Sequence, residues 1–220
     1  MPNLQAELDA LRTAWSGRAD PAVVAMVAAD IEALRASGIL DRAARPGDRM
    51  PGLTLPGADG KPVDLGDLAT RGPLVLTFYR GGWCPYCNIE LRAFQEQLGA
   101  FKAIGATLVA VSPERPDDSL DTVEKNGLAF PVLSDVNGRL ADGLGIRFHL
   151  VREIVNLHRR FGIDLPTRNG DGAWALPIPA TYVVAQDGTI LAAFVDPDYR
   201  RRIAPETALR VLDSLRRNAT

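Results

Sequence analysis

Two cysteines that stand close together are the residues of this sequence best suited to chemistry. Cys84 and Cys87 are the only cysteines among 220 residues, and they follow shortly after the apolar run 74–79. The residues after them repeat at helical spacing. The pair is therefore predicted at a junction between a buried strand and a helix. Free backbone N–H groups and the helix dipole favour a thiolate there.

The spacing of the two cysteines favours reversible bond formation. At positions i and i+3, both sulfurs lie on one side of the first helical turn and can join with little backbone movement. A pair that opens and closes easily suits redox exchange better than it suits a structural staple. Pro85 is tolerated between them because the first turn has no intrahelical partner for the missing N–H. We therefore predict that Cys84 and Cys87 are catalytic thiols.

Neighbouring side chains are candidates to support these thiols. Trp83 is expected to shield the sulfurs on one side, and Arg80 is a nearby cation that would stabilise a thiolate. Tyr86 stands between the two cysteines in the sequence. Glu90 follows Cys87 by three residues and is either a proton relay or a group that complements the helix dipole. The sequence leaves both interpretations of Glu90 open.

Two other interpretations exist for the cysteine pair. A structural zinc site needs two further ligands, and the only histidines, His149 and His158, lie far along the chain without close spacing. Alternatively, the two cysteines are inert and buried, but an inert thiol is unusual at the start of a helix after a central strand. Thiol redox chemistry is therefore the favoured interpretation, and no metal or other cofactor is expected.

A predicted helix at 151–161 brings further polar residues near the histidines. It carries Arg152, Arg159 and Arg160. The simpler interpretation of this cluster is a basic helix face exposed to solvent. The alternative is that the helix forms a lid that binds a substrate or a thiol. The following segment 164–172, rich in Asp, Asn and Gly, is predicted to be a surface loop.

Composition indicates an ordinary globular protein. Hydrophobic residues make up 46% and charged residues 24% of the chain, and the net charge is -2. This balance gives no support to nucleic-acid or membrane binding. The first residues lack the pattern of a secretory signal, and no apolar run reaches the roughly 18 residues of a membrane span. We expect a cytoplasmic protein, a setting in which a close cysteine pair is more often catalytic or metal-binding than structural.

The hydrophobic pattern divides the chain into a helical extension at 1–45 and a main domain at 46–220, with a helical insert at about 150–177. The expected elements of the main domain are a hairpin at 53–65, strands at 74–79, 106–111 and 130–133, helices at 88–104, 117–126 and 151–161, a hairpin at 181–193 and a final helix at 205–217. Two amphipathic helices are expected in the extension. The fold class is α/β, with a mixed central sheet flanked by helices.

Several motifs of the main domain resemble one known family. Gly47–Pro51 resembles the opening of the peroxiredoxins (alkyl hydroperoxide reductase/thiol-specific antioxidant family), and Phe130–Asp135 and Leu140–Ile146 resemble later motifs of the same family. The resemblance covers about 46–150 and 178–217. It implies a thioredoxin-like fold and a thiol-dependent antioxidant activity.

The cysteine motif itself departs from the usual peroxiredoxin signature, Pro-x-x-x-Thr/Ser-x-x-Cys. The signature cysteine falls on Cys87, its threonine on Cys84 and its proline on Arg80. The later arginine of the family falls near Pro179. The chain thus resembles the peroxiredoxin-like group with a Cys-x-x-Cys centre, and Cys84-Pro85-Tyr86-Cys87 is similar to a glutaredoxin centre.

The segment Ile178-Pro179 resembles the cis-proline loop that faces the cysteines of thioredoxin. This resemblance implies a cis Pro179 and an Ile178 backbone free to pair with an extended substrate. An ordinary proline at the entry of a strand is the alternative.

Three functions are consistent with these features, and the first of them, a peroxiredoxin-like antioxidant, is favoured. In a peroxiredoxin-like antioxidant, Cys87 attacks a hydroperoxide and Cys84 resolves the sulfenic acid to a disulfide. In a general thiol-disulfide oxidoreductase, Cys84 attacks and Cys87 resolves. A non-catalytic redox sensor or binding module is the third hypothesis. The expected partners are a hydroperoxide or disulfide substrate and a thiol reductant, either a thioredoxin-like protein or a low-molecular-weight thiol. The family resemblance also implies a homodimer, for which the N-terminal helices offer a surface.

Overall fold

The computed structural model describes residues 3–218 and contains a mixed central sheet. Its strand order is β5-β4-β3-β8-β9, in which β3, β4 and β5 are parallel and β8 and β9 are antiparallel to their neighbours. The strands are β3 (Leu74–Phe78), β4 (Thr107–Ser112), β5 (Val132–Ser134), β8 (Ala180–Val184) and β9 (Ile190–Val195). The predicted α/β class and mixed sheet are confirmed.

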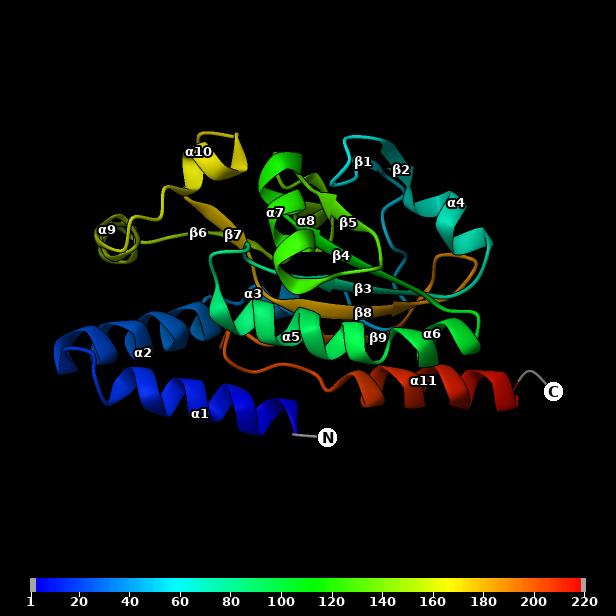
Figure 1. Ribbon diagram of the computed structural model, residues 1–220, viewed down its shortest axis with the longest axis horizontal. Coiled ribbons are helices and arrows are strands. Elements are labelled where there is room, and N and C mark those ends of the chain that lie inside the picture. Colours follow the sequence, from blue (N-terminus) through cyan, green and yellow to red (C-terminus); the bar gives the residue numbers. More distant parts are fainter. Residues whose placement is uncertain (1–2, 219–220) are drawn as a thin grey trace.

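Helices cover one face of this sheet. The alternation of side chains along β3 sends Val75 to this face, followed by Tyr79 just beyond the strand, and both join a single apolar cluster with the helices. These helices are α1 (Leu4–Ser16), α5 (Pro85–Glu96), α6 (Leu98–Ala103), α7 (Pro116–Asn126) and α11 (Pro205–Asn218). Figure 1 shows α5, α6 and α11 running along this side of the sheet.

The opposite face carries shorter elements. Leu74, Leu76 and Phe78 of β3 point into a second apolar cluster there. The elements around this cluster are α3 (Ile39–Arg42), β1 (Thr54–Pro56), β2 (Pro62–Asp64), α4 (Leu65–Thr70) and α8 (Arg139–Gly143). The predicted hairpin at 53–65 is confirmed by the antiparallel pairing of β1 and β2.

The N-terminal extension forms the two predicted helices, α1 and α2 (Pro21–Ala36). Asp20 caps α2 by accepting a hydrogen bond from the Ala22 N–H at 2.8 Å, as expected for an aspartate before Pro21. Leu4 and Leu8 of α1 are buried in the same apolar cluster as α5. Helix α1 therefore packs against α5, the helix that begins at the cysteines. Figure 1 shows that α2 lies beside the end of the sheet at which α5 begins.

Two predicted elements differ in detail. The helix predicted at 88–104 begins three residues earlier, since Pro85 occupies the first helical position, and it is interrupted at Gln97, where φ is -94° and ψ is 2°. The segment 164–172 was predicted as a surface loop, but it contains the short helix α10 (Leu165–Asn169). Leu165 and Asn169 are fully buried, so that prediction is wrong for this part of the segment.

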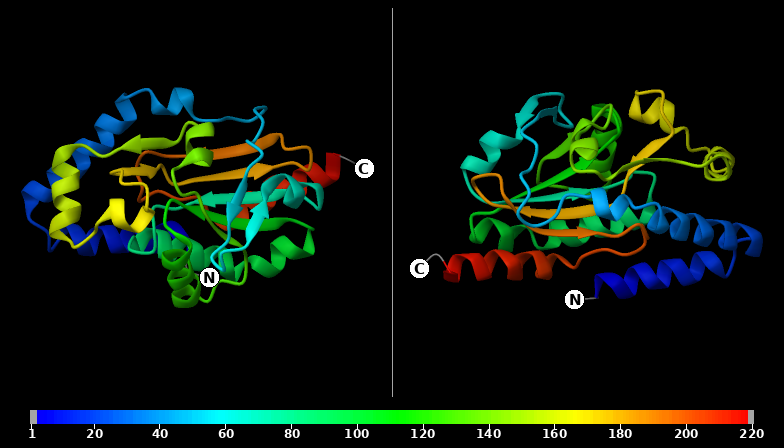
Figure 2. Two further views of the ribbon diagram at one scale, coloured as in Figure 1. Left: turned by 90° about the horizontal axis from the view of Figure 1, so that it is seen from above. Right: turned by 180° about the vertical axis from the view of Figure 1, so that it is seen from behind.

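The insert between β5 and β8 lies beside the end of the sheet from which α5 begins. It contains β6 (Arg147–His149), α9 (Arg152–Arg160), α10 and β7 (Ala175–Pro177), and β6 pairs with β7 in a separate two-stranded sheet. Figure 2 shows α9 and α10 together with α2 at this end of the molecule. The insert and α2, which are far apart in sequence, therefore meet near the cysteines.

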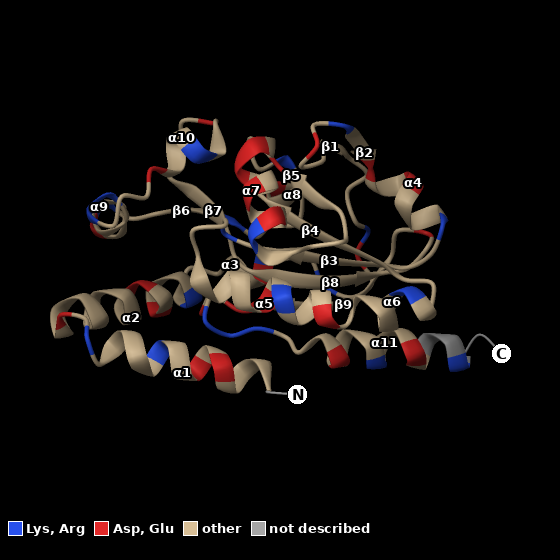
Figure 3. Cartoon of the chain, in the orientation of Figure 1, with Lys and Arg blue, Asp and Glu red and all other residues tan. Residues whose placement is uncertain are grey.

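Charges of both signs are distributed over the helices, as Figure 3 shows. Acidic residues are prominent on α7, and basic residues occur on α9 and α10. In the part of the chain that the structure describes, no helix is both long enough and apolar enough to cross a membrane.

Candidate active site

The cysteine pair lies at the predicted strand-to-helix junction. Cys84 is the N-cap residue of α5 and Pro85 is its first helical residue, so the chain turns from β3 into the helix at the cysteine motif. Cys84 is 1% exposed and Cys87 is fully buried, and both are free thiols. The side chain of Cys84 makes no capping hydrogen bond, and the positive end of the helix dipole lies at this residue, where it favours a thiolate.

The sulfur of Cys87 is held by two donors, one from the distant Arg202 and one from the nearby backbone of Arg80. Nη2 of Arg202 donates to its sulfur at 3.3 Å, and the backbone N–H of Arg80 lies 3.5 Å from the same sulfur. Nε of Arg202 also donates to Oε2 of Glu90 at 2.7 Å, and both side chains are about 2% exposed. Arg202 thus connects the sulfur of Cys87 to the buried carboxyl group of Glu90.

Electrostatics distinguish the two sulfurs. Burial opposes ionisation of Cys84, but the hydrogen bond from Cys87 and the charges of Arg80 and Arg202 outweigh it and lower the pKa of Cys84 to about 6. Burial, together with the hydrogen bond to Cys84, raises the pKa of Cys87 well above its ordinary value. The pair therefore holds one thiolate at neutral pH, on Cys84. Burial also raises the pKa of Glu90 to about 8, against the opposing effect of Arg202.

Arg80 is enclosed by aromatic rings. Its guanidinium carbon lies 4.9 Å from the ring centroid of Trp83 and 4.2 Å from that of Tyr199. Nη2 of Arg80 also lies 3.4 Å from Nε2 of His158. Cation–π contacts of this kind hold a buried guanidinium in place. Arg80 is the cation that the sequence predicts near the thiols, and the rings of Trp83 and Tyr199 pack against its guanidinium.

His158 belongs to this arrangement and not to a solvated face. It is only 7% exposed, and its Nδ1 lies 2.8 Å from the carbonyl oxygen of Ile154. Burial, together with the charge of Arg80, lowers the pKa of His158 to about 4, so the imidazole is neutral at pH 7. A solvated basic face is therefore the wrong interpretation for His158, whereas Arg152, Arg159 and Arg160 are exposed as that interpretation predicts.

A buried glutamate supports the loop that leads into the cysteines. Oε2 of Glu114 accepts a hydrogen bond from the backbone N–H of Gly82 at 2.8 Å. Burial raises the pKa of Glu114 to about 7. Gly81 has a φ of 143°, and a Cβ at this position would contact the indole nitrogen of Trp83 and lie 2.8 Å from Oε1 of Glu114. The loop therefore depends on glycine for its close approach to both groups.

A cavity of about 520 Å³ opens in front of Cys84, and we name it the thiol chamber. Its walls come from the 80–86 segment, from α2 and from α9, and Cys84 lines it whereas Cys87 does not. Ile31, Leu157 and Phe161 are among its apolar residues. The thiol chamber therefore lies beside Cys84, which is 1% exposed.

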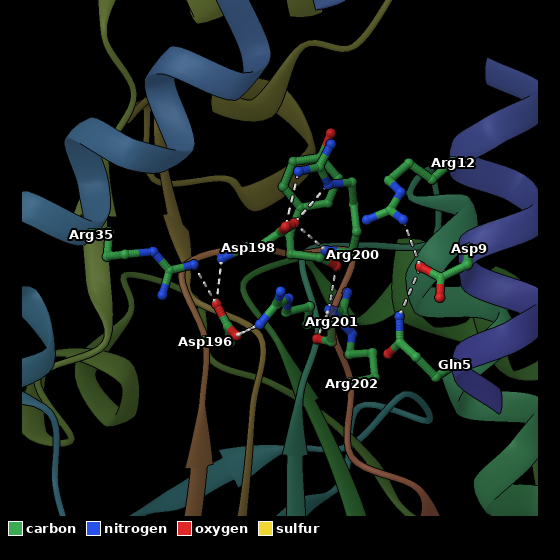
Figure 4. A network of polar contacts seen from close by, with 10 residues as sticks. Gln5, Asp9, Arg12, Arg35, Asp196, Asp198, Arg200, Arg201 and Arg202 are labelled. Atoms are coloured by element: carbon green, nitrogen blue, oxygen red, sulfur yellow. Dashed lines mark hydrogen bonds and ion pairs between the residues drawn. The ribbon is translucent and has the colours of Figure 1, made fainter. Parts of the chain in front are cut away.

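The segment after β9 supplies two of the contacts described above, Tyr199 and Arg202. Figure 4 shows how ion pairs anchor it. Asp196 pairs with Arg35 of α2 at 3.1 Å and with Arg201 at 3.8 Å. The N-terminal extension therefore holds the segment that places Arg202 against Cys87.

The remaining predicted site residues are Tyr86, Ile178 and Pro179, and the backbone of the last two differs from the prediction. Tyr86 is buried and its ring meets Tyr199 edge to face, with centroids 5.6 Å apart. Pro179 lines the thiol chamber. No peptide bond within the described residues is cis, so the cis Pro179 that the resemblance implied is wrong. The Ile178 N–H donates to the Ile146 carbonyl at 2.8 Å, so it is not free to pair with an extended substrate.

Sequence reasoning missed Arg202, Tyr199 and Glu114. The only signal for Arg202 is a run of three arginines after the last strand, and that run does not show which arginine turns inward. Within residues 3–218, no group of three or more His, Cys, Asp and Glu side chains is arranged to hold a metal ion.

Known proteins resemble this chain across the region that contains the site. The model of the AhpC/TSA family matches residues 46–193. A protein of Mycobacterium tuberculosis, named provisionally as a peroxiredoxin, is 32% identical over 149 residues, which are 67% of this chain and 83% of that protein. The thiol-disulfide oxidoreductase ResA of Halalkalibacterium halodurans is 28% identical over 116 residues, 52% of this chain and 65% of its own.

Solved structures support the fold. The crystal structure of the peroxidoxin BcpB from Mycobacterium tuberculosis superposes with a TM-score of 0.62 at 23% identity, covering 78% of this chain and 97% of that one. Together with the central sheet, this likeness confirms the thioredoxin-like fold that the sequence predicts.

Proposed function

This chain belongs to the AhpC/TSA family, and we propose from that membership and from the thiol geometry that it reduces hydroperoxides with Cys84 as the attacking thiolate and Cys87 as the resolving thiol. Membership makes it a thiol-dependent oxidoreductase of the peroxiredoxin kind. The assignment of the two cysteines is the reverse of the one implied by the family signature, in which Cys87 takes the attacking position.

One observation carries this assignment: Cys84 lines the thiol chamber and Cys87 does not. A hydroperoxide that enters the chamber meets the sulfur of Cys84 first. The lowered pKa of Cys84 makes that sulfur a thiolate at neutral pH, which is the nucleophilic form. Cys87 lies behind it, with its proton retained and its sulfur held by Arg202.

The chemistry balances with the groups present. The thiolate of Cys84 bonds to the terminal oxygen of the hydroperoxide, the O–O bond breaks, and the alkoxide takes a proton from water to leave as an alcohol. Cys84 becomes a sulfenic acid. The sulfur of Cys87 then attacks the sulfur of Cys84, and the hydroxyl group leaves with the proton of Cys87 as water. The product is a Cys84–Cys87 disulfide.

Arg202 and Arg80 have supporting roles in this cycle. Arg202 stabilises the negative charge that develops on Cys87 as it attacks, because its Nη2 already donates to that sulfur. Arg80 stabilises the thiolate of Cys84 by its charge. Glu90 is assigned as a positioning residue, since it accepts from Nε of Arg202 and so aims the guanidinium at Cys87.

Two external thiol groups complete the cycle: the first attacks the Cys84–Cys87 disulfide to form a mixed disulfide, and the second releases the protein thiol, so that the external pair leaves as a disulfide. We assign this step to a thioredoxin-like protein or a low-molecular-weight thiol, in keeping with a reducing cytoplasmic setting. Disulfide exchange with other proteins is the second candidate function, and the similarity to a thiol-disulfide oxidoreductase favours it. The engaged N–H of Ile178 argues against an extended peptide pairing at that point.

Single-cysteine variants test the proposal. Each of Cys84→Ser and Cys87→Ser is exposed to one equivalent of hydroperoxide in the presence of dimedone, and the label is located by peptide mass spectrometry. We expect a sulfenic acid on Cys84 of the Cys87→Ser protein and little label on the Cys84→Ser protein. Label on Cys87 of the Cys84→Ser protein would reverse the roles. The absence of label and of peroxide consumption in every form would refute the peroxidase.

A further inference from the structure

The proposed reaction gives no role to His158, a buried side chain of α9. This residue is 7% exposed, and its Nδ1 lies 2.8 Å from the carbonyl oxygen of Ile154, one turn earlier in the helix. A carbonyl oxygen only accepts hydrogen bonds, so Nδ1 carries the proton of the neutral ring. Nε2 of His158 is therefore left as an acceptor.

The free nitrogen of this ring faces the guanidinium of Arg80. Nη2 of Arg80 lies 3.4 Å from Nε2 of His158, and a guanidinium only donates. The two groups therefore have the right polarity for a hydrogen bond from Arg80 to His158. The buried Nε of Arg80 has no partner among the described residues. Within this part of the chain, the hydrogen bond to α9 is thus the directional contact of the Arg80 side chain.

Aromatic rings restrain Arg80 in a different way. Its guanidinium carbon lies 4.9 Å from the ring centroid of Trp83 and 4.2 Å from that of Tyr199. Cation–π contacts hold a cation over a ring face but pair no donor with an acceptor, so they leave the guanidinium free to turn over the rings. The imidazole of His158 meets Trp83 edge to face, with centroids 5.3 Å apart. The hydrogen bond from this anchored imidazole therefore opposes rotation of the guanidinium.

The charges around this pair favour a neutral His158. Burial and the adjacent charge of Arg80 lower the pKa of His158 to about 4. The other charged or titratable groups that line the thiol chamber or neighbour His158 in α9 are Asp30 of α2, Arg168 of α10, Arg159 of α9, Tyr86, Tyr199 and Cys84. A second cation beside Arg80 would be repelled by it. The ring is therefore a neutral acceptor at every pH at which the Cys84 thiolate forms.

We propose that His158 is a positioning residue of the thiol site, which holds the guanidinium of Arg80 toward Cys84 by accepting a hydrogen bond from Nη2. This inference rests on the proposed peroxidase function, in which Arg80 stabilises the Cys84 thiolate by its charge. His158 acts through Arg80 and not on the sulfur itself. Helix α9 then contributes to thiol reactivity, although it lies far from the cysteine motif in the sequence.

The experiment measures the pH dependence of Cys84 alkylation by iodoacetamide in the reduced full-length protein, with the label located by peptide mass spectrometry. His158→Leu removes the acceptor, and His158→Gln retains an acceptor oxygen. His149→Leu, which removes the exposed histidine of β6, is the matched control. We expect His158→Leu to raise the midpoint by about one pH unit, since a neighbouring opposite charge lowers a pKa by about 1–3. His158→Gln should raise it much less, and His149→Leu should leave it unchanged.

A double variant shows whether His158 acts through Arg80. Arg80→Met should raise the midpoint by itself, and His158→Leu should add little in the Arg80→Met protein, because residues that act as one unit are not additive. Circular dichroism establishes that each variant is folded. An unchanged midpoint in a folded His158→Leu protein, an equal shift in His158→Gln, or additive shifts in the double variant would overturn the positioning role.

Oxidation by hydrogen peroxide separates this role from the proposed function. A midpoint raised from about 6 to about 7 leaves about one-fifth of the thiolate at pH 6 and most of it at pH 8. His158→Leu should therefore react about fivefold more slowly than the unaltered protein at pH 6 and almost equally at pH 8. An equal loss of rate at both pH values would contradict the positioning role while the peroxidase stands. No oxidation of the unaltered protein would refute the peroxidase, and the alkylation midpoints would still decide the role of His158.

Discussion

The guanidinium of Arg202 donates a hydrogen bond to the sulfur of Cys87 over 3.3 Å, although 115 residues separate them in sequence. The same guanidinium is paired with Glu90 at 2.7 Å, and both side chains are about 2% exposed. A charge-assisted contact in a buried setting is stronger than a neutral hydrogen bond. The reactivity of the thiol pair therefore depends on a residue that lies outside the cysteine motif.

We predict that Arg202→Met slows reduction of hydroperoxide by roughly tenfold or more, since a hydrogen bond to a charged group is worth about 1.5–3 kcal/mol. The pH profile of the reaction should also move upward, because Arg202 helps to lower the pKa of Cys84. Stopped-flow oxidation of the reduced protein at several pH values measures both effects.

Two further variants separate the effect of the Arg202 charge on the thiols from an effect on folding. Arg201→Met removes an exposed neighbour that pairs with Asp196 among the described residues, and it should leave rate and pH profile almost unchanged. The double variant Arg202→Met/Glu90→Gln also replaces the buried carboxyl group of Glu90, which has lost its partner, and should regain stability without regaining rate. A normal rate in a folded Arg202→Met protein would show that Arg202 does not act on the thiols.

Alkylation of Cys84 should depend on pH in a way that reflects its lowered pKa of about 6. The folded-state pKa is below the ordinary value of roughly 8.5, so the thiolate is present above pH 6 and is lost as the pH falls through that value. We predict that the rate of reaction with iodoacetamide is half-maximal near pH 6. The protein unfolded in urea, as the reference, should give a midpoint near 8.5. A folded midpoint close to the unfolded one would contradict the assignment of the thiolate to Cys84.

The sequence predicts the position of the thiols well, for a local physical reason. Cys84 and Pro85 stand where an apolar run gives way to helical spacing, and that junction is encoded by neighbouring residues. The hairpins, the parallel strands and the two N-terminal helices follow from similar local patterns. The division into an extension and a main domain, and the dimer implied by the family resemblance, stay predictions.

The environment of the thiols could not be predicted because it depends on contacts between distant segments. His158 looks like part of a basic helix face, yet α9 turns it inward against Arg80. Arg202 and Tyr199 come from a loop with no periodic pattern. Pro179 shows a further limit. The resemblance to a proline loop correctly placed Pro179 near the thiols, but it did not predict the trans peptide bond that precedes this residue.

The ion pair between Arg35 and Asp196 should order the loop that carries Arg202 without adding much global stability. Both side chains are partly exposed, and such pairs contribute about 0.2–1 kcal/mol. We predict that Asp196→Asn changes the free energy of unfolding by less than about 1 kcal/mol and speeds amide hydrogen exchange in residues 196–202. Asp59→Asn, which removes an exposed pair with Lys61, is the matched control and should not alter exchange in that loop. Unchanged exchange in Asp196→Asn would mean that α2 does not order the segment.

Gly81 is the position at which the approach to the cysteines should be least tolerant of a side chain. Its φ of 143° is in a region that residues with a Cβ rarely adopt, and a Cβ there would meet the indole of Trp83 and the carboxylate of Glu114. We predict that Gly81→Ala destabilises the fold by about 1–3 kcal/mol and shifts tryptophan fluorescence by displacing Trp83. Gly99→Ala is the control, because Gly99 has ordinary φ and open space in α6; it should be neutral or slightly stabilising. Equal stability of the two alanine variants in urea unfolding would show that Gly81 is not required for the close packing of this loop.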